Sequence, residues 1–285
     1  MALENRYDFV ILFDVENGNP NGDPDAGNAP RIDAETGYGY VTDVCLKRKI
    51  RNYVELAKEG EPGYNILIKP DKSLNAKFTE AYETEGLKTK NKGKNQDDVR
   101  RARDYMCRNY FDVRTFGAVM STGDDPCGIV RGPVQINFAR SISPVNIQDV
   151  TITRQARTTE ERKESGETEM GKKSMIPYAL YRAEGYVSAA LANKLTDLSE
   201  EDLELLWTAI INMFENDHSA ARGKMCMRKL YIFKHSNVLG NCPSHILFDK
   251  IAVKEKENVP PRSFDDYEVT VDTQMPEGVE IIEKI

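Results

Sequence analysis

The stretch Arg131–Arg157 constrains the fold most, because apolar and polar residues alternate along it. The apolar residues of its first run recur at every second position, as in a β-strand with one buried face: Val134, Ile136 and Phe138. The polar residues of that run would lie on the opposite face: Gln135, Asn137 and Arg140. Amide and guanidinium donors without a pocket for a particular base suit a phosphate-sugar backbone. The stretch therefore predicts a sheet with one polar, basic face.

Length and composition predict a folded chain without a membrane span or a metal. With 285 residues, 40% of them hydrophobic, the chain can form one large domain with insertions or two ordinary domains. No apolar run approaches the roughly 20 residues of a membrane span, and the N-terminus lacks a signal-peptide pattern, so we expect a cytoplasmic protein. The 5 cysteines and 3 histidines are scattered without metal-ligand spacing. We expect reduced thiols, no metal site and no cofactor.

The net charge of -7 argues against indiscriminate binding of nucleic acid. The charges are nevertheless unevenly distributed, with basic residues concentrated in Lys47–Arg51, Lys88–Arg103 and Arg222–Lys234. Acidic residues collect in Asp8–Glu35 and Asp197–Asp217. Separate basic and acidic faces would allow one face to bind a polyanion and both to contact further copies of the chain. Any single charged run also fits an ordinary solvated surface.

The first half of the chain begins with a strand, a loop and a helix. Tyr7–Val15 is nearly continuously apolar, which predicts a central strand covered on both faces. The turn-rich loop Glu16–Asp25 fits a structural turn cluster or a loop whose backbone donors hold RNA, whereas its spacing does not fit an EF-hand calcium loop. Val41–Lys58 predicts a helix capped by Thr42 or Asp43, with a basic side formed by Lys47, Arg48 and Arg51.

Two segments interrupt this core as insertions. Tyr64–Asp112 is expected to be helical and basic, with a short strand at Asn65–Lys69, a mobile loop at Glu83–Gln96 and a helix at Asp97–Asp112. Phe111–Val119 would return the chain to the core. The charged, non-periodic segment Thr158–Lys173 predicts an exposed hairpin tip or a disordered loop.

The second half supplies a strand, a helix and a strand. They are predicted at Pro177–Ser188, at Glu200–Asn216 after a Ser199 cap, and at Met225–Lys234. Without the insertions the order is strand, helix, strand, strand, helix, strand. This is the α+β βαββαβ order of ferredoxin-like, RRM-like sheets, in which helices cover one face and the other is free for RNA. No RNP-type aromatic motif is present, so binding of the backbone is expected rather than base stacking.

Several motifs in this order resemble one known family. They are NGNPNGDPDAGNAPRID followed by VTDVCLKRKIR, then DVRTFGAVM, RGPVQINFARSISPV and YALYRAEGYV, and together they span most of the chain. They resemble the backbone subunit of subtype I-C CRISPR Cascade surveillance complexes, within the RAMP superfamily. The resemblance implies several copies along one CRISPR RNA, other Cascade subunits as partners, and a guide presented to target DNA.

The resemblance also implies a division of the chain. A discontinuous RRM-like palm would comprise residues 1–63, 113–141 and 177–240, with helical fingers at 64–112, a thumb hairpin at 142–176 and a peripheral C-terminal segment at 241–285. The implied RNA-binding residues lie in the first loop, the first helix, the second strand and the thumb, with two further arginines: Asn19, Asn21, Arg31, Lys47, Arg48, Arg51, Arg114, Gln135, Asn137, Arg140, Arg154, Arg157 and Met175.

Two alternatives remain open beside a non-catalytic RNA clamp. Relatives in the superfamily include ribonucleases, and four aspartates are candidates for metal ligands or a general base: Asp14, Asp23, Asp25 and Asp33. The resemblance argues against catalysis, because RNA processing in subtype I-C complexes is assigned to another subunit. The second alternative is a polymerising scaffold that binds no RNA, which the negative net charge favours.

Overall fold

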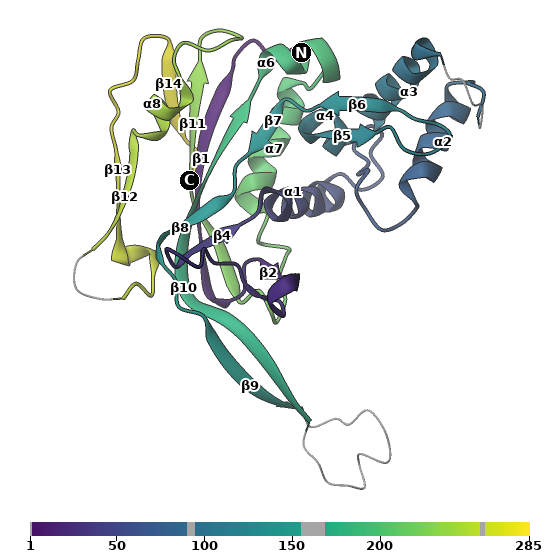
Figure 1. Cartoon of the computed structure of the whole chain (residues 1–285). Helices are drawn as coiled ribbons and strands as arrows, with labels where there is room; N and C mark the ends of the chain where they lie inside the picture. The colour runs from purple at the N-terminus through teal and green to yellow at the C-terminus, as the bar shows by residue number, and fades with distance from the viewer. Residues whose placement is uncertain (1, 90–94, 155–168, 257–259) are drawn as a thin grey trace, which may run out of the picture.

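An antiparallel sheet forms the centre of this mixed α/β protein (Figure 1). The computed structural model describes residues 2–89, 95–154, 169–256 and 260–285. The main sheet has its strands in the order β14 (Val279–Glu283), β11 (Lys224–His235), β1 (Tyr7–Gly18), β10 (Glu169–Val187), β8 (Ala139–Pro144) and β4 (Tyr38–Val41). Two further strands pair with β10, namely β7 (Val134–Ile136) and β9 (Gln148–Arg154).

Strand β1 is the central strand that the apolar N-terminal run predicts. It pairs antiparallel with β10 on one side and with β11 on the other. Its alternate side chains enter two different buried clusters, with Phe9, Ile11 and Phe13 on one face and Val10 and Leu12 on the other. Because both faces exclude water, the strand is apolar at nearly every position.

Two helices cover one face of the sheet, as predicted. α1 (Asp43–Ala57) begins at an N-cap, Thr42, and α7 (Glu200–Asn212) begins at a capping box made by Ser199 and Asp202. α6 (Ala189–Leu191) and the π-helical turn η2 (Ala192–Thr196) connect β10 to α7. The buried side chains of the two main helices join Phe9, Ile11 and Phe13 in one core: Leu46, Ile50, Val54, Leu203, Leu206, Trp207 and Ile210. The predicted strands and helices occur in the predicted order, but the sheet also contains β4 before α1 and β14 at its edge, which that order lacks.

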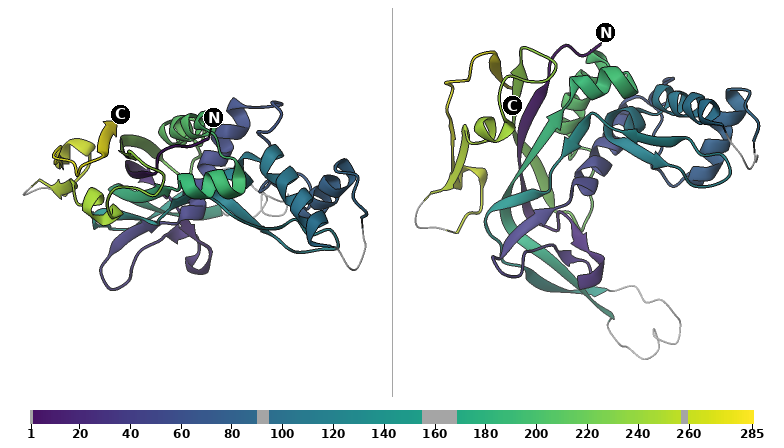
Figure 2. Two further views of the ribbon diagram at one scale, coloured as in Figure 1. Left: turned by 90° about the horizontal axis from the view of Figure 1, so that it is seen from above. Right: turned by 45° about the horizontal axis from the view of Figure 1, so that its top comes forward.

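The segment between α1 and β7 has a second hydrophobic core. It comprises α2 (Leu74–Thr84), α3 (Gln96–Asn109), α4 (Phe111–Phe116) and a hairpin of β5 (Gly117–Met120) and β6 (Gly128–Arg131). Figures 1 and 2 show this unit on the opposite side of the molecule from the C-terminal segment. The buried members of this second core extend from Leu67 to Val130, past the predicted boundary at Asp112. Among the described residues, no helix is both long and apolar enough to cross a membrane.

Local predictions inside this segment were partly wrong. Asn65–Lys69 is not a strand, since only Asn65 forms an isolated bridge, to Tyr110. The predicted helix at Asp97–Asp112 is split at Tyr110, whose extended backbone ends α3 and begins α4. α2 was not predicted, and part of the predicted loop Glu83–Gln96 lies outside the described residues.

The second face of the sheet is not free, contrary to the prediction. α8 (Ser244–Phe248), β12 (Ile251–Glu255), η3 (Phe264–Asp266) and β13 (Tyr267–Val271) lie against it as a C-terminal cover. Buried side chains from three strands meet this cover: Val10, Leu12, Tyr178, Leu180, Tyr231 and Phe233. An exposed sheet face of this composition would be unfavourable in water, so the C-terminal segment completes the fold.

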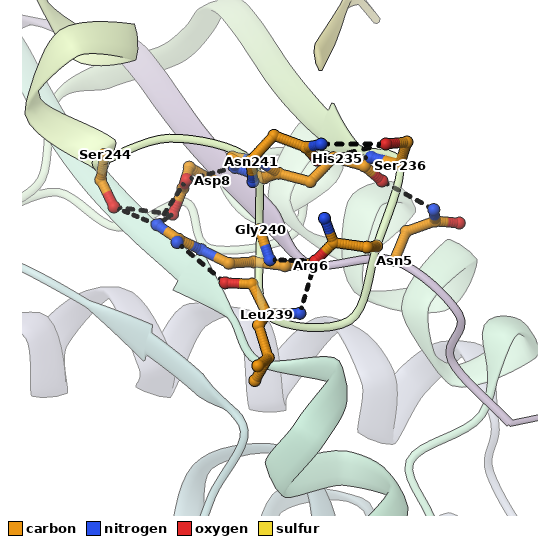
Figure 3. Close-up of polar contacts among 10 residues, drawn as sticks. Asn5, Arg6, Asp8, His235, Ser236, Leu239, Gly240, Asn241 and Ser244 are labelled. Atoms are coloured by element: carbon orange, nitrogen blue, oxygen red, sulfur yellow. Dashed lines mark hydrogen bonds and ion pairs between the residues drawn. The ribbon is translucent and has the colours of Figure 1, made fainter. Parts of the chain in front are cut away.

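A buried polar network attaches the C-terminal cover to the sheet (Figure 3). Asp8 accepts hydrogen bonds from Ser244 Oγ at 3.1 Å and from Arg6 at 2.9 Å, and its Oδ2 lies 2.8 Å from His235 Nε2. The other ring nitrogen of His235, Nδ1, accepts from the Asn241 backbone N–H at 2.8 Å. His235 therefore donates its Nε2 proton to Asp8, and the network links β1, β11 and the start of α8.

The strand predicted at Arg131–Arg140 is broken in the middle. Asn137 and Phe138 separate β7 from β8, and the alternation changes phase there. As a result Ala139 enters the core, whereas Phe138, predicted to be buried, is 56% exposed. The register of β10 imposes this break, because it pairs with β7 at Gly185–Val187 and with β8 at Tyr181 and Arg182.

A two-stranded hairpin of β9 and the first half of β10 projects from the body (Figures 1 and 2). Its pairs run from Gln148 opposite Met175 to Arg154 opposite Glu169. β10 therefore starts earlier than the predicted Pro177. The predicted tip or loop at Thr158–Lys173 lies outside the described residues up to position 168, and its last residues belong to β10.

Candidate nucleic-acid interface

A groove lies on the second face of the sheet, beside the C-terminal cover. We call this cavity of about 310 Å³ the sheet groove; it is lined by Asn137, Phe138, Arg140, Ser141, Ile142, Arg182, Glu184 and Val253. Asn137 and Arg140, both predicted to lie on the polar face, are exposed in it. Strict alternation with Val134 and Ile136 would place Arg140 on the buried face, and the phase change between β7 and β8 brings it to this one. The side-chain amide of Asn137 donates to the Tyr186 hydroxyl at 3.1 Å. The predicted polar face therefore exists as a groove rather than as a whole sheet face.

Arg140 is a cation of the sheet groove that forms no direct ion pair among the described residues. Its guanidinium lies 4.5 Å from the centre of the Tyr38 ring and donates to Thr36 Oγ1 at 3.4 Å. Arg182, by contrast, is paired with Glu184 at 2.9 Å. An anionic group entering the groove would meet Arg140 first.

Gln135 and Lys47 meet, although 88 positions separate them in the sequence. Lys47 Nζ lies 3.4 Å from Gln135 Oε1 and donates to Asp43 Oδ2 at 2.9 Å, one turn earlier on α1. The structure thus brings together one residue from the predicted helix stripe and one from the predicted polar strand.

The other two basic residues of the α1 stripe have internal partners. Arg48 donates to the Ile68 carbonyl at 2.6 Å and remains half-buried. Arg51 Nε donates to Asp112 Oδ2 at 2.8 Å, and the Asp112 side chain is only 1% exposed. Removing the Arg51 side chain would leave a buried carboxylate without its cation, so this residue also holds α1 to the second core.

Arg114 is excluded from the candidate RNA contacts. Its guanidinium forms a two-pronged ion pair with Asp202 at 2.7 and 3.0 Å and also donates to the Gly63 carbonyl. The side chains of Arg114 and Asp202 are only 8% and 6% exposed. The prediction that Arg114 contacts RNA was wrong, because a buried carboxylate on α7 occupies its donors.

The first loop folds back onto the start of α1. It contains β2 (Gly22–Asp23), the 3₁₀ turn η1 (Pro24–Ala26) and β3 (Ala29–Pro30), and β2 pairs with β3. Asn21 Oδ1 accepts from both the backbone N–H and the hydroxyl of Thr42, each at 3.0 Å. Asn21 therefore fixes the residue that caps α1, which agrees with the structural-turn interpretation of this loop.

Asn19 and Arg31 lie in the same loop with less solvent access than expected. Asn19 is 7% exposed and donates to the Asn28 carbonyl at 2.7 Å. Arg31 forms an ion pair with Asp23 at 3.4 Å. The side chains of both residues thus have partners within the loop, although Asn19 Oδ1 and Arg31 Nε are buried without a hydrogen-bond partner.

The thumb candidates lie on or next to the projecting hairpin. Met175 is half-buried near its base, opposite Gln148. Arg154 ends β9, and Arg157 lies outside the described residues. These residues are far from α1 in the sequence and come from a different part of the fold.

The four candidate catalytic aspartates do not form a metal centre among the described residues, where no group of three or more His, Cys, Asp or Glu side chains is placed to hold a metal. Asp14 accepts from the Tyr178 hydroxyl and from Arg228 Nε, each at 2.8 Å; burial first, and then this carboxylate, raise the pKa of Tyr178. Asp23 accepts from the backbone N–H of Asp25 at 3.1 Å. A hydrogen bond from Thr36, with a smaller contribution from Arg140, lowers the pKa of Asp33.

Arg182 and Glu184 also line the sheet groove, although neither was predicted as a site residue. Both lie on β10 at alternate positions, and the YALYRAEGYV motif shows this alternation. Arg182 is directly opposite Arg140 in the register. Their spacing of two predicts that both side chains lie on one face of the strand. The sequence does not show, however, that β8 pairs with β10 at this point and brings Arg140 next to them.

Comparisons with known proteins agree with the fold. The chain is 27% identical over 233 residues to CRISPR-associated protein Cas7 of Haloferax volcanii, a match that covers 74% of this chain and 66% of the relative. A chain of a CRISPR RNA-guided surveillance complex (pre-nicking) has a similar structure, with a TM-score of 0.50, 16% identity and coverage of 80% of this chain and 75% of that chain. A chain of another CRISPR RNA-guided surveillance complex gives a TM-score of 0.47 at 15% identity, covering 80% and 68%.

The family model described as CRISPR-associated protein Cas7 matches residues 5–272. The match covers the main sheet except β14, the second core and the C-terminal cover as far as Val271. The chain belongs to the Cas7 family of CRISPR-associated proteins.

Proposed function

We propose that this chain is a non-catalytic subunit that binds along CRISPR RNA and, with further copies of itself, forms the backbone of a subtype I-C CRISPR surveillance complex. Family membership supports the CRISPR role, and the solved structures with a similar fold are CRISPR RNA-guided surveillance complexes. The observation that carries RNA binding is the sheet groove, where Arg140 is exposed without an ion-pair partner and Asn137 offers an amide. Target DNA and other complex subunits are further partners in this proposal.

The division into palm, fingers and thumb is part of the proposal. The palm comprises the main sheet with α1 and α7, and the thumb is the hairpin at 142–176. We place the fingers at 64–131 instead of 64–112, because β5 and β6 complete the second core. Residues 241–271 form the cover on the second face, and β14 adds an edge strand to the main sheet.

The RNA contacts in this proposal are ranked by what each side chain is free to do. Arg140 is exposed without an ion-pair partner, and Asn137 and Gln135 are exposed although each amide also has one internal acceptor. Met175, Arg154 and Arg157 belong to the thumb. The remaining candidates shape the surface while holding internal partners: Asn19, Asn21, Arg31, Lys47, Arg48 and Arg51. Such contacts carry no base specificity, which suits a protein whose guide strand reads the target by base pairing.

The internal partners of Asp14, Asp23 and Asp33 support a non-catalytic role over a metal-dependent ribonuclease. The cytoplasmic location expected from the sequence stays a prediction.

A salt titration of the purified chain with single-stranded RNA tests the proposal. Because Arg140 would neutralise one phosphate, Arg140→Ala should make the slope of log K against log salt shallower by about 0.7. The matched control is Lys194→Ala, which removes an exposed positive charge near α6 and should leave the slope unchanged. A chain that oligomerises but binds no RNA at low salt would favour the scaffold alternative, and RNA cleavage abolished by Asp23→Ala or Asp33→Ala would favour the ribonuclease.

A further inference from the structure

Phe138 is an aromatic side chain that the fold turns outward. It is 56% exposed and lines the sheet groove, so the fold leaves much of an apolar ring in contact with water. The phase change between β7 and β8 places the small Ala139 in the core instead. The larger of these two neighbouring apolar side chains, Phe138, is therefore the exposed one. Its ring lies in a groove, where a ligand can contact it.

A second ring supports Phe138 from below. Tyr40 on β4 lies parallel to it, with an interplanar angle of 6° and ring centres 6.2 Å apart, an offset-stacked arrangement. Tyr40 of β4 and Phe138, which lies between β7 and β8, therefore form a flat aromatic step. A planar group laid on Phe138 would extend this parallel arrangement of rings.

The groups around this step suit a nucleotide better than an apolar protein surface. Arg140 is two positions after Phe138 and lines the same groove, where it can contact a phosphate of a bound strand. Asn137, the residue before Phe138, adds a side-chain amide to the lining. Of the remaining lining residues, Arg182, Glu184 and Ser141 are also polar. A groove that surrounds one exposed aromatic ring with mainly polar side chains resembles a stacking platform on a nucleic-acid-binding sheet.

We propose that Phe138, backed by Tyr40, stacks on one unpaired nucleobase of a bound single strand while Arg140 contacts the adjacent phosphate. This inference rests on the proposed RNA binding and deepens it, because it adds a base contact to a surface otherwise expected to hold only the backbone. Stacking does not distinguish among the bases, since each base has a π-face, so the site remains blind to sequence.

The test compares the full chain and its variants on two probes. One is a single-stranded RNA of about 8 nucleotides, and the other is its fully abasic counterpart, which keeps the sugars and phosphates. Phe138→Ala should weaken binding of the normal RNA by about 5- to 150-fold and leave binding of the abasic strand unchanged. Phe138→Tyr should restore most of the affinity, because it keeps the ring.

Two controls separate stacking from other effects. Val119→Ala truncates another exposed apolar residue, 69% exposed on β5, and should bind both strands like the wild type. The salt slope should not change in Phe138→Ala, in contrast to Arg140→Ala, because no phosphate contact is lost.

Three outcomes would overturn the inference in distinguishable ways. Wild-type affinity of Phe138→Ala for the normal RNA would remove the stacking site while leaving the proposed function intact. Reduced self-association by light scattering, with RNA affinity unchanged, would assign Phe138 to a contact between copies of the chain. Failure of the wild type to bind either strand would reject the proposed function itself.

Discussion

At the scale of single residues, the partner of an arginine decides its role. Arg114 and Arg140 are both arginines in segments that the sequence connects with RNA. Arg114 is 7% exposed and is held by Asp202, whereas Arg140 is exposed and stacks on the Tyr38 ring. The same side chain thus stabilises the fold at one position and is available for a ligand at the other.

Exchanging each arginine for alanine should therefore give opposite results. Arg114→Ala leaves Asp202 buried without its cation and should lower the free energy of unfolding by about 3–5 kcal/mol. Arg140→Ala should change stability by only about 0.5 kcal/mol, as expected for an exposed side chain, while weakening RNA binding. Urea unfolding and RNA binding measured on both variants check this. Equal stability losses would contradict the structural role assigned to Arg114.

At the scale of elements, the β9–β10 hairpin contributes to the surface more than to the core. Among the described residues, the three buried clusters contain no member from the hairpin between positions 149 and 174. The two strands begin from a close pair, Gln148 and Met175. An element that is joined to the body at one end and packs little against it can be shortened without unfolding the sheet.

Shortening the hairpin should separate binding from stability. Replacing residues 149–174 with an Asn-Gly turn connects Gln148 to Met175 in the geometry of a tight hairpin. The urea midpoint should stay near that of the wild type, while the salt slope for RNA becomes shallower by about 0.7 for each cationic side chain of the removed segment that contacts phosphate, with Arg154 and Arg157 as the proposed ones.

The double variant Arg154→Ala, Arg157→Ala in the full-length hairpin is the matched comparison. If the double variant changes the salt slope as much as the shortened hairpin does, the lost phosphate contacts belong to these two arginines. RNA binding unaffected by the shortened hairpin would remove the thumb from the proposal.

At the scale of the whole molecule, the C-terminal cover places the main sheet between two hydrophobic clusters, one on each face. The helices bury one face, and α8, β12 and β13 bury Val10, Leu12 and Phe233 on the other. The buried Asp8–His235 interaction and Ser244 hold the cover in place (Figure 3). The cover also leaves the sheet groove as the open part of this face.

Neighbouring residues of α8 test the contribution of the cover. Leu247 is fully buried, so Leu247→Ala should cost about 2–5 kcal/mol of unfolding free energy. Ile246→Ala is the control one position earlier, where the side chain is 39% exposed, and it should cost far less. Urea unfolding followed by tyrosine fluorescence and circular dichroism measures both. A negligible loss for Leu247→Ala would mean that the cover does not stabilise the sheet.

The sequence by itself determined the elements whose signals are local. The apolar run of β1 and the capped amphipathic helices α1 and α7 depend on periodicity and capping, which act over a few residues. The polar character of Asn137 and Arg140 could also be read from the sequence alone. The motifs in their order were sufficient to indicate the family.

The tertiary structure decided which of these polar residues remain free. Whether Arg51 and Arg114 meet Asp112 and Asp202 depends on packing between distant segments, and local periodicity carries no information about it. The exposed position of Phe138 follows from the register of β10, and the loss of the free sheet face follows from an apolar C-terminal segment that folds back across it. Both depend on contacts between residues far apart in the sequence. Only the assembled fold therefore decided that a groove, and not the whole predicted face, stays open to solvent.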